Sequence, residues 1–276
     1  MKWIVGSGKM KLFYNKSFIG YSHIKNNKPC QDYSDSFKGH DRVIVTCSDG
    51  HGSDVYFRSD LGSKFASDAV IKVLSKTTLK KLKNPEKIKL DILCEWNSLV
   101  ESHLEENPIN FDELTYLNDK DKQKLTSNPV VAYGTTVNAV MLYKNKIICI
   151  QLGDGGIFII SKKDIMTAFE DDEETVANLT YSLCSDDAYD HLNLNIFDYD
   201  EEQSIFLCTD GVLAPYQSMT NFKNSFIIPI LRLIKNKGIE SGKYLDKFFS
   251  SLANEKGNGD DVSFGCIVDY SSFYKL

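Results

Sequence analysis

The chain has 276 residues, 42% of them hydrophobic, so it can bury one sizeable core, and a single domain over residues 1–276 is the simplest expectation. A formal net charge of −6 argues against a nucleic-acid-binding surface. The N-terminal apolar run is too short for a signal peptide and no uncharged stretch is long enough to span a bilayer, so we expect a cytoplasmic protein that acts without nucleic acid or membrane. The seven cysteines contain no C-x-x-C pair, and four lie in strand-like runs, which is typical of buried cysteines in a reducing compartment.

The N-terminal part of the chain predicts strands followed by a helix. Residues 11–24 lack helical spacing, and residues 32–37 and 42–48 are typical of two strands joined by a turn. From Ser53 the period changes, since Ser53 is a suitable helix cap and apolar residues then recur every fourth position. We expect this helix to end near residue 74.

The middle of the chain predicts a second helix and then strands. Apolar residues share one face over residues 88–103, whereas the polar segment 107–128 predicts a loop. Residues 134–143 and 146–152 predict strands about a short turn, and residues 157–160 predict a third strand of the same β-meander. The acidic run 170–174 predicts a solvated surface loop with no role in a site.

The C-terminal part repeats the alternation. A strand is expected at 204–209, helices at 221–234 and 239–252, and a last strand at 262–270. Strands, two helices, strands, two helices and a strand then follow one another along the chain. This order favours an α+β domain with helices stacked outside a β core.

Acidic residues stand at the ends of four predicted strands. Residues 43–48 run into Asp49-Gly50-His51-Gly52, residues 147–152 into Gly153-Asp154, and residues 204–209 into Asp210-Gly211, while Asp260-Asp261 opens the last strand. A single Asp-Gly after a strand is typical of a tight turn. Four such positions that converge from distant parts of the chain would instead form the all-oxygen site that Mg²⁺ and Mn²⁺ prefer.

The ordered set of motifs resembles the metal-dependent protein phosphatases of type 2C, the PPM family. The matches are Gln31-Asp32, Asp49-Gly50-His51-Gly52, Gly134-Thr135-Thr136, Gly153-Asp154, Thr209-Asp210-Gly211 and Asp260-Asp261. Ser22-His23 together with Pro29-Cys30-Gln31-Asp32 is similar to a bacterial branch of the family. The resemblance implies a four-layer αββα sandwich, in which a central antiparallel β-sandwich is flanked by helix pairs and carries a two-metal site at one end.

The resemblance also implies the role of each site residue. The implied metal ligands, for two Mn or Mg ions and a third, weaker one, are Asp32, Asp49, Gly50, Asp154, Asp210 and Asp260. Asp49 would bridge two ions, Asp154 would bind the third, and His51 would be the general acid that protonates the leaving alkoxide. The chemistry suits these residue types, because two ions about 4 Å apart activate a bridged water and an imidazole titrates near neutral pH.

Two departures from the family pattern concern the substrate phosphate. Asn27 stands where the family often has a phosphate-gripping arginine, and Lys25 or Lys28 is the candidate substitute, as a point charge without the bidentate fork of arginine. Gln31 stands where glutamate is frequent, and its amide can still hydrogen-bond a metal-bound water but carries no charge.

Two further departures concern the metal positions. Asp261 replaces a common asparagine, so both Asp260 and Asp261 remain candidates for the ligand at this point of the chain. Gly155-Gly156 replaces a small polar residue and an arginine after the aspartate of the third metal site.

Three functions are compatible with this sequence. The resemblance implies a metal-dependent protein serine/threonine phosphatase, a monomer that hydrolyses phosphoserine and phosphothreonine in a phosphorylated protein substrate and counteracts a Ser/Thr kinase. The alternative is a catalytically weak or inactive pseudophosphatase that binds a phosphoprotein or regulates a kinase. A third is an acidic interaction domain, which predicts no tight manganese binding. Aspartate at every implied acidic metal position favours the enzyme.

Overall fold

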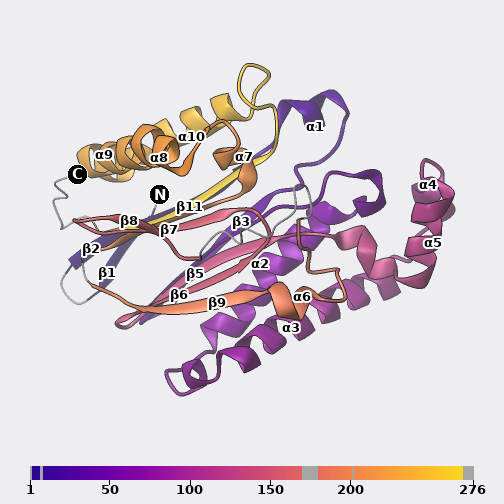
Figure 1. The fold of residues 1–276 in the computed structure, drawn as a ribbon, viewed down its shortest axis with the longest axis horizontal. Helices are drawn as coiled ribbons and strands as arrows, with labels where there is room; N and C mark the ends of the chain where they lie inside the picture. Colours follow the sequence, from indigo (N-terminus) through magenta and orange to yellow (C-terminus); the bar gives the residue numbers. More distant parts are fainter. Residues whose placement is uncertain (1, 7–8, 170–179, 201, 270–276) are drawn as a thin grey trace.

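Two antiparallel sheets lie face to face, with helices on the outer side of each (Figure 1). The computed structural model describes residues 2–6, 9–169, 180–200 and 202–269. The helix–sheet–sheet–helix order confirms the four-layer sandwich expected from the sequence. The acidic run 170–174 lies outside the described residues, so its surface position stays a prediction.

The six-stranded sheet joins the two ends of the chain. Its strands, in spatial order, are β1 (Lys2–Gly6), β2 (Lys9–Phe18), β11 (Val262–Asp269), β10 (Ser204–Cys208), β7 (Gly156–Ile160) and β8 (Ile165–Thr167). β2 pairs with β11 along its length, with Phe18 opposite Val262. Strands predicted near both ends of the sequence are thus neighbours in space.

The five-stranded sheet corrects one expectation about topology. Its order is β3 (Tyr33–Lys38), β4 (Arg42–Ser48), β5 (Val137–Tyr143), β6 (Lys146–Leu152) and β9 (Asn193–Asp198). β5 and β6 form the predicted hairpin, but β7 pairs with β10 and β8 in the other sheet, so the predicted meander is wrong in its third strand. Gly153, with φ of +99°, provides a left-handed turn where the chain leaves the five-stranded sheet after β6. The edge strand that pairs with β6 is β9.

Alternation along β4 shows how the core is divided. Val43, Val45 and Cys47 belong to the apolar cluster between the sheets, whereas Ile44 belongs to the cluster under the outer helices. Successive strand residues point to opposite faces, so a strand covered on both sides is apolar throughout. This burial explains the hydrophobic run 43–45 and the burial of Thr46 and Cys47 after it.

Helices α2 (Ser59–Ser75) and α3 (Pro85–Glu106), with the short α6 (Ala188–His191), cover the five-stranded sheet. The predicted α3 is confirmed, and the Asn84 side chain caps its first turn. α2 begins later than expected, because residues 54–56 form a 3₁₀ turn and Ser53 makes no side-chain cap. Its buried face is made mostly of small residues such as Gly62 and Ala66, so the helix packs closely.

The segment 107–128, which we name the α4–α5 arm, contradicts the prediction of a loop. It contains α4 (Phe111–Leu114) and α5 (Asp119–Ser127), and a 3₁₀ helix (Pro129–Tyr133) follows it. Asn110 and Glu113 form a capping box, and Asn118 caps α5. Local capping stabilises these helices despite the low hydrophobicity of the segment. The buried Leu117 and Leu125 pack the segment into the core cluster that α2 and α3 share with the five-stranded sheet.

The outer face of the six-stranded sheet carries the second helix pair. Its elements are α7 (Asp210–Leu213), α8 (Met219–Phe222), a π-helical turn (Lys223–Ile227), α9 (Ile228–Lys237), a 3₁₀ turn (Gly238–Glu240) and α10 (Ser241–Leu252). α9 and α10 confirm the two predicted helices. A short α1 (Tyr21–Lys25) precedes β3. No helix in the described part of the chain combines the length and apolarity needed to cross a bilayer.

Candidate functional site

Strand pairing brings the predicted aspartates to one end of the sandwich. β4 and β6 end at the same edge of their sheet, because β5 runs antiparallel between them. In the other sheet Cys208, the last residue of β10, lies opposite Gly156 of β7 and Phe264 of β11. The turns that carry Asp154, Asp210 and Asp260 therefore lie together, facing the turn after β4.

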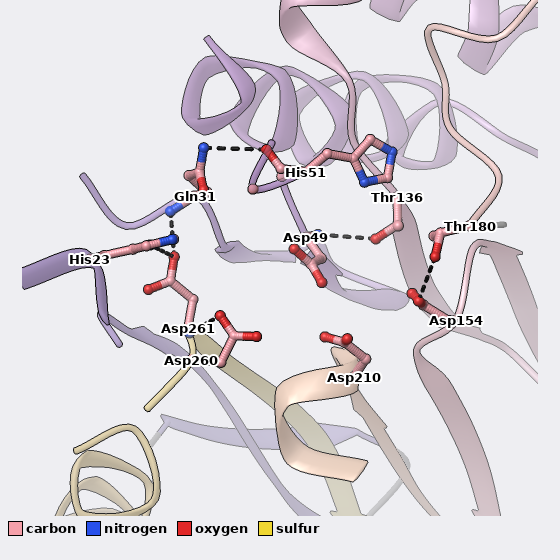
Figure 2. Close-up of a pocket in the computed structure, with 12 residues that line it drawn as sticks. His23, Gln31, Asp49, His51, Thr136, Asp154, Thr180, Asp210, Asp260 and Asp261 are labelled. Atoms are coloured by element: carbon pink, nitrogen blue, oxygen red, sulfur yellow. Dashed lines mark hydrogen bonds and ion pairs between the residues drawn. The ribbon is translucent and has the colours of Figure 1, made fainter. Parts of the chain in front are cut away.

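These turns enclose a polar pocket (Figure 2). Its lining residues are His23, Gln31, Asp49, Gly50, His51, Gly52, Thr136, Asp154, Thr180, Asp210, Asp260 and Asp261. Five of the six implied metal positions and the implied general acid thus line one space. Asp32 is the implied metal position that is missing from this lining.

Three carboxylates form the closest group in the pocket. Asp49, Asp154 and Asp210 each present an oxygen within 4.8 Å of the other two. Asp260 points into the same space from the opposite side (Figure 2). Burial raises the pKa of Asp49 well above its usual value, and the neighbouring carboxylates raise it further; burial also raises the pKa of Asp210. Such a group of carboxylates favours divalent cations, whose charge compensates the mutual repulsion.

The Gly134-Thr135-Thr136 motif holds the turn that carries Asp49. The Thr136 N–H and the Thr135 hydroxyl both donate to the Asp49 carbonyl, each at 2.8 Å, and the Asp49 N–H donates to Thr136 Oγ1 at 3.1 Å. The His51 N–H donates to the Gly134 carbonyl at 3.1 Å. The motif therefore fixes the backbone on both sides of Gly50, which positions the Asp49 carboxylate and the His51 ring.

The His51 imidazole lies at the pocket wall against an aromatic ring. Its centroid is 4.8 Å from that of Tyr56, and a Cβ on Gly134 would lie 2.4 Å from the Tyr56 ring and 2.9 Å from the imidazole. Burial lowers the pKa of His51, Asp154 opposes this shift, and Lys124 adds to it. The imidazole is therefore mostly neutral at pH 7, and an approaching phosphate dianion would favour its protonated form.

Gln31 contributes a free acceptor to the pocket. Its amide nitrogen donates to Ser59 Oγ at 2.6 Å and to the His51 carbonyl at 3.3 Å, which fixes the orientation of the amide. Its Oε1 is buried and accepts no hydrogen bond from any residue in the described ranges. This oxygen suits a metal-bound water, which is the role that the sequence suggested for an amide at this position.

Asp260 and Asp261 have different surroundings. The Asp261 carboxylate is 4% exposed and accepts hydrogen bonds from the backbone of Gly20 and Gln31, both at 2.6 Å, and from Asp32 at 3.4 Å. It also bonds His23 Nδ1 at 2.9 Å. Three backbone donors and an imidazole satisfy a carboxylate, so Asp261 ties α1 to the sheets and leaves Asp260 to face the pocket.

Asp32 lies behind the pocket wall. Its carboxylate is 4% exposed and accepts a hydrogen bond from Thr209 Oγ1 at 2.8 Å. Burial raises its pKa well above the usual value, and the Asp261 charge adds to this shift. Asp32 thus holds Thr209, the residue that precedes Asp210.

Neither predicted phosphate-binding lysine reaches the pocket. Lys25 is exposed on α1, and Lys28 forms an ion pair with Asp54 at 3.3 Å. Among the described residues of the lining none is lysine or arginine. His23 and His51 are the titratable nitrogen groups that this lining contains.

The structure adds residues that sequence patterns did not assign. Thr180 donates to Asp154 Oδ2 at 2.7 Å, and nothing in the local sequence marks a threonine 26 positions away as its partner. The Gly155-Gly156 departure has a steric reason, because a Cβ on Gly155 would lie 2.0 Å from the Asn138 amide nitrogen and one on Gly156 2.6 Å from the Phe158 ring. Neither position has room for the larger residues of the family pattern.

Comparisons with known proteins agree with this architecture. The sequence model of protein phosphatase 2C matches residues 19–250, whereas no curated protein sequence matches the chain. The fold is similar to the catalytic domain of the serine/threonine protein phosphatase PstP in complex with two manganese ions, at 16% identity, a TM-score of 0.60, and coverage of 94% of this chain and 97% of that chain.

Two other solved structures show the same fold. PppA, described as a regulatory component of the type VI secretion system of Pseudomonas aeruginosa, matches at 13% identity and a TM-score of 0.61, covering 94% of this chain and 97% of its own. RsbX in complex with magnesium matches at 12% identity and a TM-score of 0.51, covering 96% and 98%. Since the family model spans most of the chain, the protein belongs to the protein phosphatase 2C family of phosphoprotein phosphatases.

Proposed function

We propose that the chain is a metal-dependent protein serine/threonine phosphatase that hydrolyses phosphoserine and phosphothreonine with a water bridged by two Mn²⁺ or Mg²⁺ ions. The observation that carries the proposal is the group of Asp49, Asp154 and Asp210, whose oxygens lie within 4.8 Å of one another. Asp260 faces the same space (Figure 2). Both sheets contribute ligands to one pocket, which supports a single catalytic domain.

The donor set suits these ions. Hard divalent cations prefer carboxylate, carbonyl and water oxygens, and beside Gly50 the lining offers five carboxylates, of which that of Asp261 is already held by hydrogen bonds. Asp49 would bridge the ions, with Asp210 and Asp260 as further ligands and Asp154, held by Thr180, at a third position. The relatives PstP and RsbX, solved with manganese and magnesium, support the choice of metal.

The ions would activate a water and stabilise charge on the phosphate oxygens. The chain's own residues perform the remaining tasks. Gln31 Oε1 would orient a bound water, and the turn fixed by Thr135 and Thr136 would hold the Asp49 carboxylate in place. His51 would give a proton to the leaving serine or threonine oxygen, which leaves poorly as an alkoxide. The substrate would be a phosphorylated protein, and the enzyme, acting as a monomer, would counteract a Ser/Thr kinase.

Removal of the metal is expected to remove the activity. After exhaustive chelation, hydrolysis of a phosphothreonine peptide should fall to background, because no protein nucleophile is assigned and the metal ions would supply the attacking oxygen. Added manganese should restore the rate. Phosphate release, measured with and without chelator, checks this expectation.

Two outcomes would contradict the proposal. Full activity after chelation would exclude the two-metal mechanism. No activity at saturating manganese, combined with tight binding of a phosphoprotein, would instead favour the pseudophosphatase.

A further inference from the structure

The pocket lining is acidic, and Lys124 lies close to the side of the pocket that His51 forms. Lys124 of α5 is exposed, and its Nζ lies 5.5 Å from the centre of the Tyr56 ring. The Tyr56 ring in turn packs on His51, with 4.8 Å between the centroids. Within the described part of the chain, Lys124 has no ion-pair partner.

The α4–α5 arm holds Lys124 at this place. The buried Arg58 donates from two nitrogens to the Glu113 carboxylate, at 2.7 and 2.8 Å, which ties the arm to α2. The Asn118 side chain caps α5, and Leu125, next to Lys124, is buried in the core. The lysine backbone is therefore fixed, and its ammonium group lies near the Tyr56 ring that packs on His51.

The position of Lys124 determines what it can bind. Lys124 does not line the pocket, so a phosphate group bound in the pocket would not be its ligand. Lys124 Nζ lies 5.5 Å from the centre of the Tyr56 ring, which lies 4.8 Å from the centre of the His51 ring. Together these two distances equal the length of about three residues of extended chain, at roughly 3.3 Å per residue. A side chain of a bound peptide close to the phosphorylated residue would reach it.

We infer that Lys124 is a specificity residue that binds an acidic side chain within three positions of the phosphorylated serine or threonine. This inference rests on the proposed phosphatase function and names the substrate class: phosphoproteins with an acidic residue beside the phosphorylation site. An unpaired ammonium group attracts a carboxylate, and the Tyr56 ring stabilises the cation through a cation–π interaction.

Kinetics with matched peptides test this inference. The substrates are phosphothreonine peptides that carry Glu or Gln in turn at each of the three positions on either side, with para-nitrophenyl phosphate as a substrate without flanking residues. At one or more positions the wild type should prefer Glu by about two- to fivefold in kcat/KM, which is the size of an exposed ion pair. Lys124→Ala should abolish the preference, Lys124→Glu should reverse it, and added salt should weaken it.

The control is Lys122→Ala, two positions earlier on α5 and so not on the same side of the helix. This variant should keep the preference, and all variants should hydrolyse para-nitrophenyl phosphate like the wild type. A preference for Glu that survives in Lys124→Ala, or that is absent from an active wild type, would overturn this inference and leave the proposed function in place. A wild type inactive on every substrate would overturn the proposed function itself.

Discussion

Asp49→Ala is expected to abolish manganese-dependent hydrolysis of both a phosphothreonine peptide and para-nitrophenyl phosphate. The side chain belongs to the closest group of carboxylates in the pocket and would bridge both ions, so its loss removes several kcal/mol of transition-state stabilisation, or roughly 10³-fold or more in kcat. Steady-state kinetics at saturating manganese measure this loss. Asp198→Ala is the control, because Asp198 is exposed and pairs with Lys146 at the opposite end of β6.

The same position links activity to stability. The pKa of Asp49 is raised in the folded, metal-free protein, so this carboxyl binds its proton more tightly in the folded than in the unfolded chain. Its contribution to stability is present below the unfolded pKa of about 3.9 and is lost as the pH rises through the folded pKa. Asp49→Asn should therefore raise the Tm of the metal-free protein at pH 7 while abolishing its stabilisation by manganese.

Two results would contradict this account of Asp49. One is wild-type kcat in Asp49→Ala at saturating manganese, and the other is an equal loss of activity in Asp198→Ala. Either would show that the acidic pocket is not the metal site.

His51→Ala should slow substrates according to how much their leaving group needs a proton. Phosphothreonine releases a strongly basic alkoxide, so loss of a general acid should lower kcat by about 10² to 10⁴. An aryl phosphate releases a stabilised phenolate and should lose much less. The ratio of kcat for a phosphothreonine peptide to that for para-nitrophenyl phosphate, in wild type and variant, isolates proton donation.

The packing around His51 makes a control necessary. The ring contacts Tyr56, and its backbone is part of the turn that positions Asp49, so a large disturbance would slow both substrates. Equal losses on the two substrates would show that His51 shapes the turn and is not the acid. His40→Ala, at an exposed position between β3 and β4, should change neither rate.

Sequence patterns predicted most elements whose signal is local. The apolar stripe of α3 and the hairpin of β5 and β6 follow from periodicity and turn residues, and both are confirmed. The α4–α5 arm was predicted as a loop, since a capping box and a few buried leucines give little periodicity. The transfer of β7 to the second sheet depends on pairing with β10, more than 40 residues away, which no local pattern records.

The sequence predicts the acidic residues of the site but not the lysine near it. Asp49, Asp154, Asp210 and Asp260 follow from their positions at strand ends, and the structure brings them together. Lys25 and Lys28 are predicted to bind phosphate because they are close in sequence to Asn27, but neither side chain lines the pocket. Lys124 approaches the pocket through folding of the α4–α5 arm, so its position is a property of tertiary structure.

Anomalous diffraction from a crystal of the protein soaked with manganese tests the central claim most directly. The account predicts two strong peaks about 4 Å apart, with the Asp49 carboxylate between them and Asp210 and Asp260 as further ligands. It also predicts that the peaks vanish in Asp49→Ala. A pocket without a peak at saturating manganese, in a crystal of a protein that is active in solution, would contradict the two-metal site.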